Sequence, residues 1–330
     1  MPSKAESTAA IAYFLTVLLG WFGGVPDAFA QPYPSKLIRI VVPAGPGGTL
    51  DIMARVIGQK LSDNVKQPVV VDNRAGASGI IGTTFLAKAP PDGHTIMLGS
   101  STTHATNVAA YAKLPYDAVK DFAPITNVAE TTFLLCVHPS IPARNVKEFV
   151  ALAKSRPGEV TYASFGLGGI AHFITEEFSR AVGIKMLHVP YKSGPDASKA
   201  LMAGHVMASF DALAVMLPHI KSGRVRPIAI GATNRSLAAP EIPTFLESGI
   251  AGYTSSVWYG VFAPANTPND IVQKLSSEII NILASPEMLA RLEGLGLKVI
   301  GSTPEQLAAL VLSDIERYVN VARQANIRAD

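Results

Sequence analysis

The sequence predicts an α/β fold made of two lobes, each a sheet flanked by helices. From residue 33 onward, short β-branched runs alternate with segments whose apolar residues recur at helical spacing, which is typical of a parallel, doubly wound sheet. The chain has 330 residues, too many for one typical core. A unit of strand, glycine-rich loop and helix occurs early and again after residue 160. Two such units facing each other would form a cleft.

The first such unit spans residues 37–61. Residues 37–42 are an apolar strand, and the next six residues hold three glycines and two prolines, which indicates a loop. Apolar residues at positions 50, 54, 57 and 61 then predict a helix, with Gly48 as its N-cap and Asp51 in its first turn. Backbone N–H groups at such a helix start suit an anion.

A tight turn without a ligand is the alternative for this loop. No Gly-Lys-Ser/Thr follows Gly48, so the loop is not a phosphate-binding P-loop. Leu50 occupies the place of the third glycine of a dinucleotide fingerprint.

Two further loops follow the next two predicted strands. Strands are expected at residues 69–71 and 95–98, and a helix at 80–89. Residues 73–79 are glycine-rich, and residues 99–107 form a loop with four consecutive hydroxyl side chains at 100–103. Ligands of parallel sheets lie beyond the carboxyl ends of strands, so we expect all three loops at one edge. The hydroxyls could donate hydrogen bonds to a carboxylate, although such groups more often cap helices.

The remaining elements describe a passage into a second lobe and back. The apolar run 125–137 is long for a strand and is predicted to enter the second lobe; residues 257–263 are predicted to return. Between them we expect helices at 146–153 and up to 181, and strands at 160–164, 186–190, 206–210 and 227–230. Helices follow at 270–283 and 286–295, and a capping box at Thr303 and Gln306 opens the last helix.

The N-terminus is predicted to be a cleaved export signal. Residues 11–22 are apolar but short for a membrane span, and the small residues Ala28 and Ala30 suit cleavage after Ala30. An uncleaved anchor is the alternative. We therefore expect residues 1–30 to be removed and the mature protein to be soluble outside the cytoplasm.

Composition excludes several classes of function. The net charge is only +3 and the basic residues are dispersed, which argues against nucleic acid as a partner. The single cysteine, Cys136, excludes an internal disulfide and a cysteine-based metal cluster. His172 and Glu176 are spaced as metal ligands on a helix but lack a third ligand, so no metal site is expected.

An ordered set of short motifs resembles one protein family over the chain from residue 33 to the C-terminus. The motifs are Tyr33-Pro-Ser-Lys36, Pro43…Pro46-Gly-Gly-x-x-Asp51…Ala54-Arg55, Asn73-Arg-x-Gly-Ala, Pro91-Asp-Gly93, Leu114-Pro-Tyr-Asp117, Asp121-Phe-x-Pro124, His188-Val-Pro-Tyr-Lys192 and Phe262-Ala-Pro-Ala-x-Thr-Pro268. Together they resemble the Bug (tripartite tricarboxylate transporter) solute receptors.

The resemblance implies a periplasmic, two-lobed "Venus flytrap" receptor of type II-like fold. Lobe 1 would be residues 31–128 plus 255–330, lobe 2 residues 129–254, and the ligand cleft would lie between them. It would be a monomer without a cofactor, closing on a small organic carboxylate and delivering it to a transporter with integral membrane subunits.

The resemblance also implies a set of ligand-binding residues. Lobe 1 would contribute the backbone of Ala44, Gly45, Gly47 and Gly48, and then Ser101, Thr103, His104 and Asn107. The opposite lobe would contribute Ser164, Gly166, Gly168 and His172, with Tyr191 and Asp211 near the cleft. Asp51 would brace the first loop without touching the ligand.

Departures from the family pattern bear on the ligand. Ile170 and Ala171 stand where the family often has serines, Ser193 replaces a glycine, and Met207 replaces an acid. These changes make the second wall more apolar. We therefore expect a carboxylate with an apolar or aromatic body, for example a dicarboxylate, in preference to a hydroxylated acid such as citrate.

Two other functions are alternatives to a transport receptor. A hydrolase would need a nucleophile, a base and an orienting acid, and Ser164, His172 and Asp211 supply the residue types, but no Gly-x-Ser-x-Gly elbow surrounds Ser164. A sensor that feeds a signalling partner would have the same fold as a transport receptor. We expect a receptor and no enzyme.

Overall fold

The computed structural model describes residues 33–329, and Lys36–Asp330 form one compact unit. The predicted export signal and its cleavage after Ala30 lie outside the described residues. No helix of the described residues is long and apolar enough to cross a bilayer.

The first part of the sheet, called here the β1 sheet, contains the first strand of the described chain, β1, and the last, β10. Its order is β2 (Val69–Asn73), β1 (Ile38–Val42), β3 (Thr95–Ser100), β9 (Ser256–Pro264) and the first part of β4 (Phe122–Val137), with β10 (Leu297–Val299) also on β4. The first three strands are parallel, whereas β9 is antiparallel to both β3 and β4.

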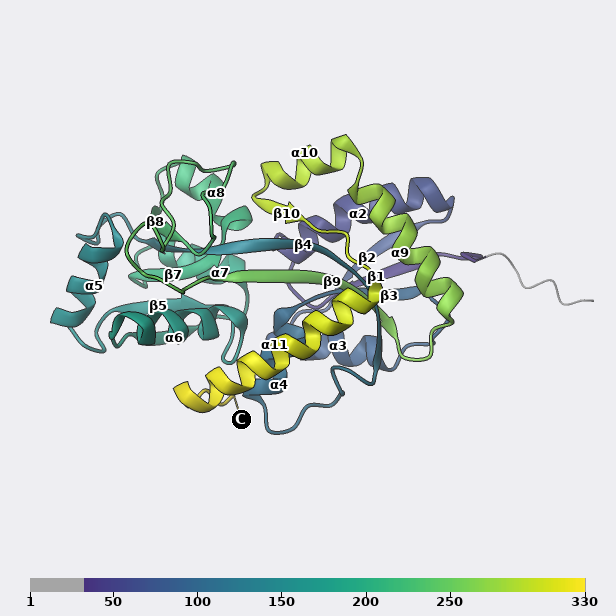
Figure 1. The fold of residues 1–330 in the computed structure, drawn as a ribbon, viewed down its shortest axis with the longest axis horizontal. Helices are drawn as coiled ribbons and strands as arrows, with labels where there is room; N and C mark the ends of the chain where they lie inside the picture. Colours follow the sequence, from purple (N-terminus) through teal and green to yellow (C-terminus); the bar gives the residue numbers. More distant parts are fainter. Residues whose placement is uncertain (1–32, 330) are drawn as a thin grey trace, which may run out of the picture. The chain divides into compact units, whose positions relative to one another are not determined.

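The second part, called here the β5 sheet, is built on the end of β4. Residues 133–137 of β4 pair with β7 (Ala208–Ala212) and β8 (Arg226–Ile230), and beyond β7 lie β5 (Thr161–Ser164) and β6 (Leu187–Pro190). In Figure 1, β4 and β9 run side by side in the β1 sheet, and β4 continues into the β5 sheet.

The prediction of an all-parallel sheet is wrong at these two strands. β4 carries the chain out of the β1 sheet and β9 carries it back, so the two must run in opposite directions. The predicted passage of one long strand between the lobes corresponds to β4.

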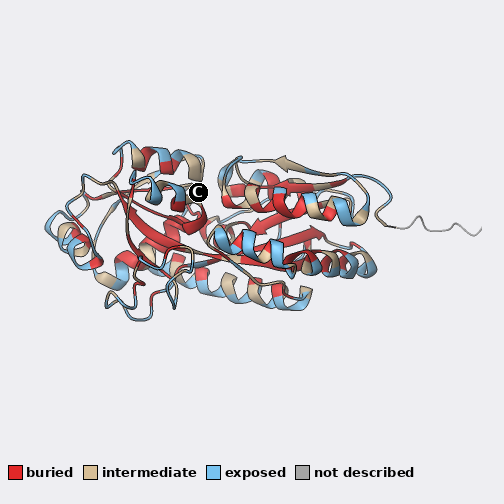
Figure 2. Cartoon of the chain, turned by 90° about the horizontal axis from the view of Figure 1, so that it is seen from above, coloured by how far each residue is buried: buried red, intermediate tan, exposed pale blue. Residues whose placement is uncertain are grey.

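The helices cover the faces of both sheets. They are α2 (Thr49–Val65), α3 (Ile80–Ala87), α4 (Asn107–Ala110), α5 (Val146–Ser155), α6 (Ile170–Val182), α7 (Gly194–Met202), α8 (Leu213–Lys221), α9 (Asn269–Leu283), α10 (Pro286–Gly294) and α11 (Pro304–Ala325), with short turns η1 (Ala77–Gly79) and η2 (Thr102–Thr106). Figure 2 shows the strands as buried and the helices as buried on one side only.

The sequence patterns did not predict two helices, α7 and α8, and each of them contains a proline. Pro195 lies in the first turn of α7, where a missing N–H costs nothing, and Ser193 caps that turn. Pro218 lies inside α8. The region 99–107, predicted as a loop, instead ends β3 and continues as a π-helical turn, η2, into α4.

Each sheet has its own apolar core. The β1 core contains Val41, Met97, Phe262 and Leu307. The β5 sheet packs one face on α7 and α8, through residues such as Leu201 and Met216, and the other on an aromatic cluster. The members of that cluster are Phe178, Phe210, Phe245 and Tyr253.

The C-terminal helix joins the two sheets. The predicted capping box of Thr303 and Gln306 is present at the start of α11. Near the other end, Tyr318 packs edge-on against Phe173 of α6 with ring centroids 5.5 Å apart, and Arg317 lies 3.4 Å from the Glu177 carboxylate. α11 thus rests on α6, a helix of the β5 sheet (Figure 1).

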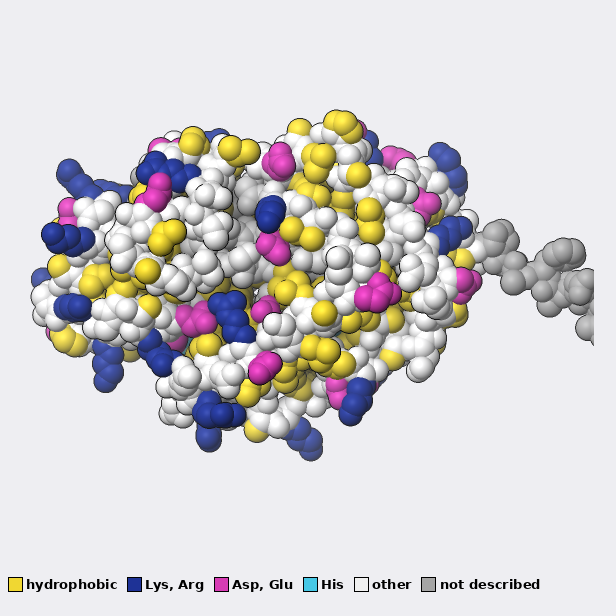
Figure 3. All heavy atoms as spheres, in the orientation of Figure 1, with side chains coloured by type: hydrophobic (Ala, Val, Ile, Leu, Met, Phe, Trp, Pro, Cys, Tyr) yellow, Lys and Arg dark blue, Asp and Glu magenta, His cyan; other side chains and the backbone are white. Residues whose placement is uncertain are grey.

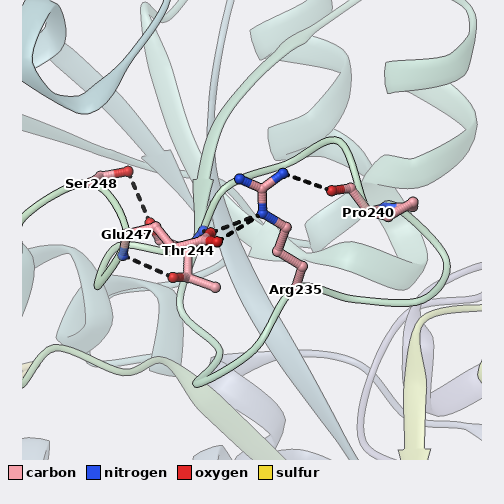
Figure 4. Close-up of polar contacts among 5 residues, drawn as sticks. All are labelled: Arg235, Pro240, Thr244, Glu247 and Ser248. Atoms are coloured by element: carbon pink, nitrogen blue, oxygen red, sulfur yellow. Dashed lines mark hydrogen bonds and ion pairs between the residues drawn. The ribbon is translucent and has the colours of Figure 1, made fainter.

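Residues 231–255 have little regular structure and are held by side-chain contacts. Arg235 Nε donates to both carboxylate oxygens of Glu247 at 3.0 and 2.9 Å, and its Nη1 donates to the Pro240 carbonyl at 3.0 Å (Figure 4). Glu247 also accepts from the backbone N–H of Thr244. On the face drawn in Figure 3, acidic and basic side chains are interspersed.

Candidate functional site

A cavity lies where the loops of the two sheets meet. From the β1 sheet it is lined by Pro43, Ala44, Gly45, Gly48, Thr49, Leu50, Ala75, Gly76, Ser78, Gly79, Ser100, Thr102, Thr103, Val257 and Tyr259; from the β5 sheet by Phe133, Phe165, Ile170, Lys192, Ser193, Gly194, Pro195, Asp211, Ala212 and Val215. The prediction that the loops after the first three strands meet at one edge is confirmed. The opposing loop after β5 contributes Phe165 and Ile170.

The loop between β1 and α2 is held in place by Asp51, in the first turn of α2. Its carboxylate accepts a hydrogen bond from the Gly47 N–H at 2.9 Å and lies 2.9 Å from Arg55 Nη2. Burial would raise the pKa of Asp51, but the hydrogen bonds from Arg55 and Gly47 outweigh it and lower that pKa. Gly47 has φ of +82°, a conformation that favours glycine.

The N-terminus of α2 opens into the cavity. Gly48 is its N-cap and offers no side-chain acceptor to the first N–H groups of the helix. Gly48, Thr49 and Leu50 all line the cavity. The positive end of the helix dipole and unsatisfied N–H donors are therefore available to an anion there.

The turn after β2 forms one rim of the cavity. Ala77 and Ser78 both have positive φ, and the Asn107 side chain holds the Ser78 carbonyl at 3.1 Å. Ser78 Oγ donates to the Leu167 carbonyl of the β5 sheet at 3.2 Å. A Cβ on Gly166 would lie only 2.7 Å from Ser78 Oγ, so this close approach needs glycine.

A second rim joins the β1–α2 loop to the start of α7. A Cβ added to Gly45 would lie 3.8 Å from the Cβ of Ser193. Ser193 caps α7 by accepting from the Asp196 N–H, and Lys192 directly precedes it. The two rims bring the β1 and β5 sheets together on either side of the cavity.

Three of the four consecutive hydroxyl residues, Ser100, Thr102 and Thr103, line the cavity. Thr103 lines it, with its Oγ1 bonded to Ser100 and 2.9 Å from His104 Nδ1. Ser101 and His104 are instead buried: Ser101 Oγ accepts from the Trp258 N–H, and His104 stacks on Phe262 with centroids 3.8 Å apart. Burial lowers the pKa of His104 to about 3, so its imidazole is neutral.

The glycine loop after β5 is fixed by histidines that do not line the cavity. Ser164 Oγ lies 2.6 Å from His188 Nε2, and His188 stacks on His172 at 4.1 Å. The Gly168 N–H donates to His172 Nδ1 at 3.2 Å. Burial lowers the pKa of His172 to about 4 and that of His188 to about 3.

The predicted site residues therefore fall into two groups. The cavity is lined by Ala44, Gly45, Gly48, Thr103 and Asp211. Gly47, Ser101, His104, Asn107, Ser164, Gly166, Gly168, His172 and Tyr191 lie behind it, mostly in contacts that shape its loops. Tyr191 packs against the core of the β5 sheet.

The sequence analysis expected a more apolar second wall but did not identify the cation or most of the apolar residues that line the cavity. Lys192 is exposed and lines the cavity, and no acidic side chain of residues 33–329 pairs with it. Phe133, Phe165, Val215 and Val257 give the cavity its apolar surface. The position of Lys192 two residues after the end of β6 was the available signal.

The three residue types of a hydrolase do not assemble. Ser164 bonds to His188, whereas His172 accepts from Gly168. Asp211 accepts from Ser198 Oγ at 3.1 Å and from the Ala212 N–H at 2.7 Å. Within the described residues there is also no group of three or more His, Cys, Asp or Glu that could hold a metal ion.

Comparisons with known proteins agree over most of the chain. A family model described as "Tripartite tricarboxylate transporter family receptor" matches residues 53–327. The chain is 35% identical to Protein BugT of Bordetella pertussis over 300 residues, covering 91% of this chain and 92% of BugT.

Solved structures give the same picture. A protein of R. palustris solved with adipate has 34% identity and a TM-score of 0.87, over 90% of this chain and 99% of that one. MatC of Rhodopseudomonas palustris, solved with bound malate, has 32% identity and a TM-score of 0.83, over 88% and 99%.

Proposed function

The chain belongs to the tripartite tricarboxylate transporter receptor family, and we propose that its ligand is a dicarboxylate with an apolar body. It is a solute receptor with the α/β periplasmic-binding-protein fold, and its family is not one of enzymes. The observation that carries the ligand proposal is the composition of the cavity. An uncapped helix N-terminus and Lys192 suit carboxylates, and aromatic and aliphatic side chains form the walls.

The energetics of such a site are consistent with this ligand. Micromolar affinity requires about 8 kcal/mol. A helix dipole contributes about 0.3–1 kcal/mol, whereas each charge-assisted hydrogen bond contributes about 1.5–3 kcal/mol. Several such bonds at the α2 N-terminus and Lys192, together with burial of an apolar chain against Phe133 and Phe165, would reach this affinity. Two relatives were solved with dicarboxylates: adipate, which has an apolar chain, and malate, which carries a hydroxyl group.

The proposal extends to the working cycle. Residues 31–128 with 255–330 would be one lobe and 129–254 the other, in keeping with the change of strand partners along β4 near residue 133. The protein would be a periplasmic monomer, released by cleavage after Ala30, that delivers its ligand to integral membrane subunits of the transporter. A signalling partner is the alternative recipient, and neighbouring genes would distinguish the two.

Thermal unfolding against a carboxylate panel tests the ligand class. The purified receptor, stripped of bound ligand by unfolding and refolding, is heated with adipate, malate, hexanoate, acetate and citrate. A dicarboxylate at 100 times its Kd adds about 2.7 kcal/mol, which raises the Tm by roughly several degrees for lobes of this size. The proposal fails if citrate stabilises more than adipate, or if no dicarboxylate shifts the Tm.

Lys192 is expected to recognise the second carboxylate. Lys192→Ala should weaken adipate binding about tenfold, equivalent to ~1.4 kcal/mol, and weaken hexanoate binding less than about threefold. Isothermal titration calorimetry measures both. Lys199→Ala, which removes an exposed cation of α7 outside the cavity, is the matched control. Equal losses for both ligands would instead place Lys192 at the carboxylate they share.

A further inference from the structure

Asp211 is a buried acid in the wall of an anion-binding cavity. It lies near the end of β7, its side chain is on the opposite face from Phe210, and only 3% of its surface is exposed. α8 begins two residues later, at Leu213. A carboxylate in this place opposes the charge of the proposed ligand, so its presence needs an explanation.

The partners of Asp211 are all neutral. Ser198 Oγ of α7 donates to Oδ2 at 3.1 Å, and the Ala212 N–H donates to Oδ1 at 2.7 Å. From β4 and β9 the ionisable neighbours are Cys136 and Tyr259, and burial raises the pKa of both, so both are neutral. Lys192 is the cation that shares the cavity, and no Lys or Arg of residues 33–329 forms an ion pair with Asp211.

A buried carboxylate without a cation is costly to ionise. Burial raises the pKa of Asp211 to about 7, although the Ala212 and Ser198 hydrogen bonds lower it in part. Near neutral pH the group is therefore poised between its two forms. A second negative charge arriving in the same cavity favours the neutral form further, because two like charges in a buried site cannot both remain ionised cheaply.

We propose that Asp211 takes up one proton from solvent when a dicarboxylate enters the cavity, and that its O–H then donates a hydrogen bond to a carboxylate oxygen of the ligand. This inference rests on the proposed function. The exchange forms one O–H bond on Asp211, takes the proton from water or buffer, and leaves the ligand fully ionised. Asp211 thereby selects for carboxylate ligands while its own charge is removed.

The competing arrangement makes the opposite prediction. If Asp211 stays ionised, it accepts a hydrogen bond from a hydroxyl or ammonium group of the ligand. Binding would then take up no proton, and a ligand with such a donor would bind more tightly than adipate.

Proton uptake can be counted by calorimetry on the purified full-length mature receptor. Succinate, adipate and malate are titrated in turn at pH 8 in phosphate and in Tris, whose ionisation enthalpies differ. The difference in observed heat gives the protons bound per ligand. We expect close to one proton at pH 8, falling toward zero at pH 6, where Asp211 is mostly protonated while the dicarboxylates are still mostly ionised. The Kd should weaken by up to about tenfold per pH unit above pH 7.

Two variants test whether Asp211 is the residue that takes up the proton. Asp211→Asn keeps the shape and supplies an N–H donor, so uptake should vanish and the Kd should become independent of pH between 6 and 9. Asp63→Asn, an exposed acid on α2, should behave as wild type. Because uptake is measured on the wild-type protein, the inference stays testable even if Asp211→Asn folds poorly.

The outcomes separate this inference from the function on which it rests. Binding of a dicarboxylate without proton uptake at pH 8 overturns the role of Asp211 and leaves the receptor intact. Uptake that persists in Asp211→Asn assigns the proton to another group and also overturns it. If none of the three dicarboxylates binds, the proposed ligand class fails, and this inference fails with it.

Discussion

Asp51→Ala is expected to lower the affinity for adipate by about 100-fold or more, equivalent to ~2.7 kcal/mol of binding free energy. Asp51 is 4% exposed and does not line the cavity, yet it holds the loop that does. Its carboxylate accepts the Gly47 N–H and pairs with Arg55, and Arg55 in turn donates to Asn73. Alanine removes the contacts of Asp51 with Gly47 and Arg55, so the N–H groups at the start of α2 lose their fixed direction.

Calorimetric titration of adipate measures this loss, and circular dichroism at equal temperature shows whether the fold is kept. Asp63→Ala, on the exposed face of the same helix, is the matched control and should bind as wild type. The bracing role would be disproved if Asp51→Ala stayed folded and bound adipate within threefold of wild type.

Asp51 also makes the stability of the fold depend on pH. The pKa of Asp51 is lower in the folded protein than in the unfolded chain, so its contribution to stability is present above its ordinary value of 3.8. That contribution is lost as the pH falls through the lowered value. The effect of Asp211 on stability has the opposite sign. Because its pKa is raised in the folded protein, the free energy of unfolding falls as the pH rises from about 4 to about 7.

Phe178→Ala is expected to cost about 3–5 kcal/mol of the free energy of unfolding. Phe178 is fully buried in α6, and its ring centroid lies 5.3 Å from that of Phe210, 5.2 Å from that of Phe245 and 5.6 Å from that of Tyr253. Truncation leaves a cavity that three rigid rings cannot fill by rotating. The lost contacts with these rings add to the lost burial.

Urea or thermal unfolding measures the loss, which corresponds to a Tm lower by roughly 2–4 °C per kcal/mol for a domain of this size. Leu237→Ala is the control: Leu237 is 91% exposed, and its loss should change stability by less than about 0.5 kcal/mol. A cost below about 1 kcal/mol for Phe178→Ala would mean that the cluster does not hold α6 on the β5 sheet.

The strands and their order along the chain could be predicted from the sequence, but their directions could not. The sequence predicts one long strand over residues 125–137, within the observed β4, but the pattern carries no information on which neighbours it pairs with. β4 changes partners from β9 to β7 between Thr132 and Phe133, directly after the polar run 130–132, but no turn or loop signal marks the change. Strand direction follows from the route of the whole chain, which local periodicity does not contain.

For the site, the sequence identified the loops better than the side chains within them. Thr103 faces the cavity and His104 faces Phe262, although they are neighbours, because the segment forms a π-helical turn. The glycines and Asp211 could be found from their position after strands. Phe133 and Tyr259 could not, because the register of β4 and β9 brings them to the cavity from distant parts of the chain.

The two long strands that cross between the sheets have a mechanical consequence. β4 and β9 are hydrogen-bonded to each other from Phe122 to Thr132, so the β1 and β5 sheets are joined by a paired ribbon and not by loose linkers. A paired ribbon of this kind carries the twist of a β-sheet along its length. The angle between the two sheets therefore depends on the conformation of these two strands. Closing the cavity on a ligand would bend or twist this ribbon. The contacts with the ligand would have to supply the free energy of that distortion.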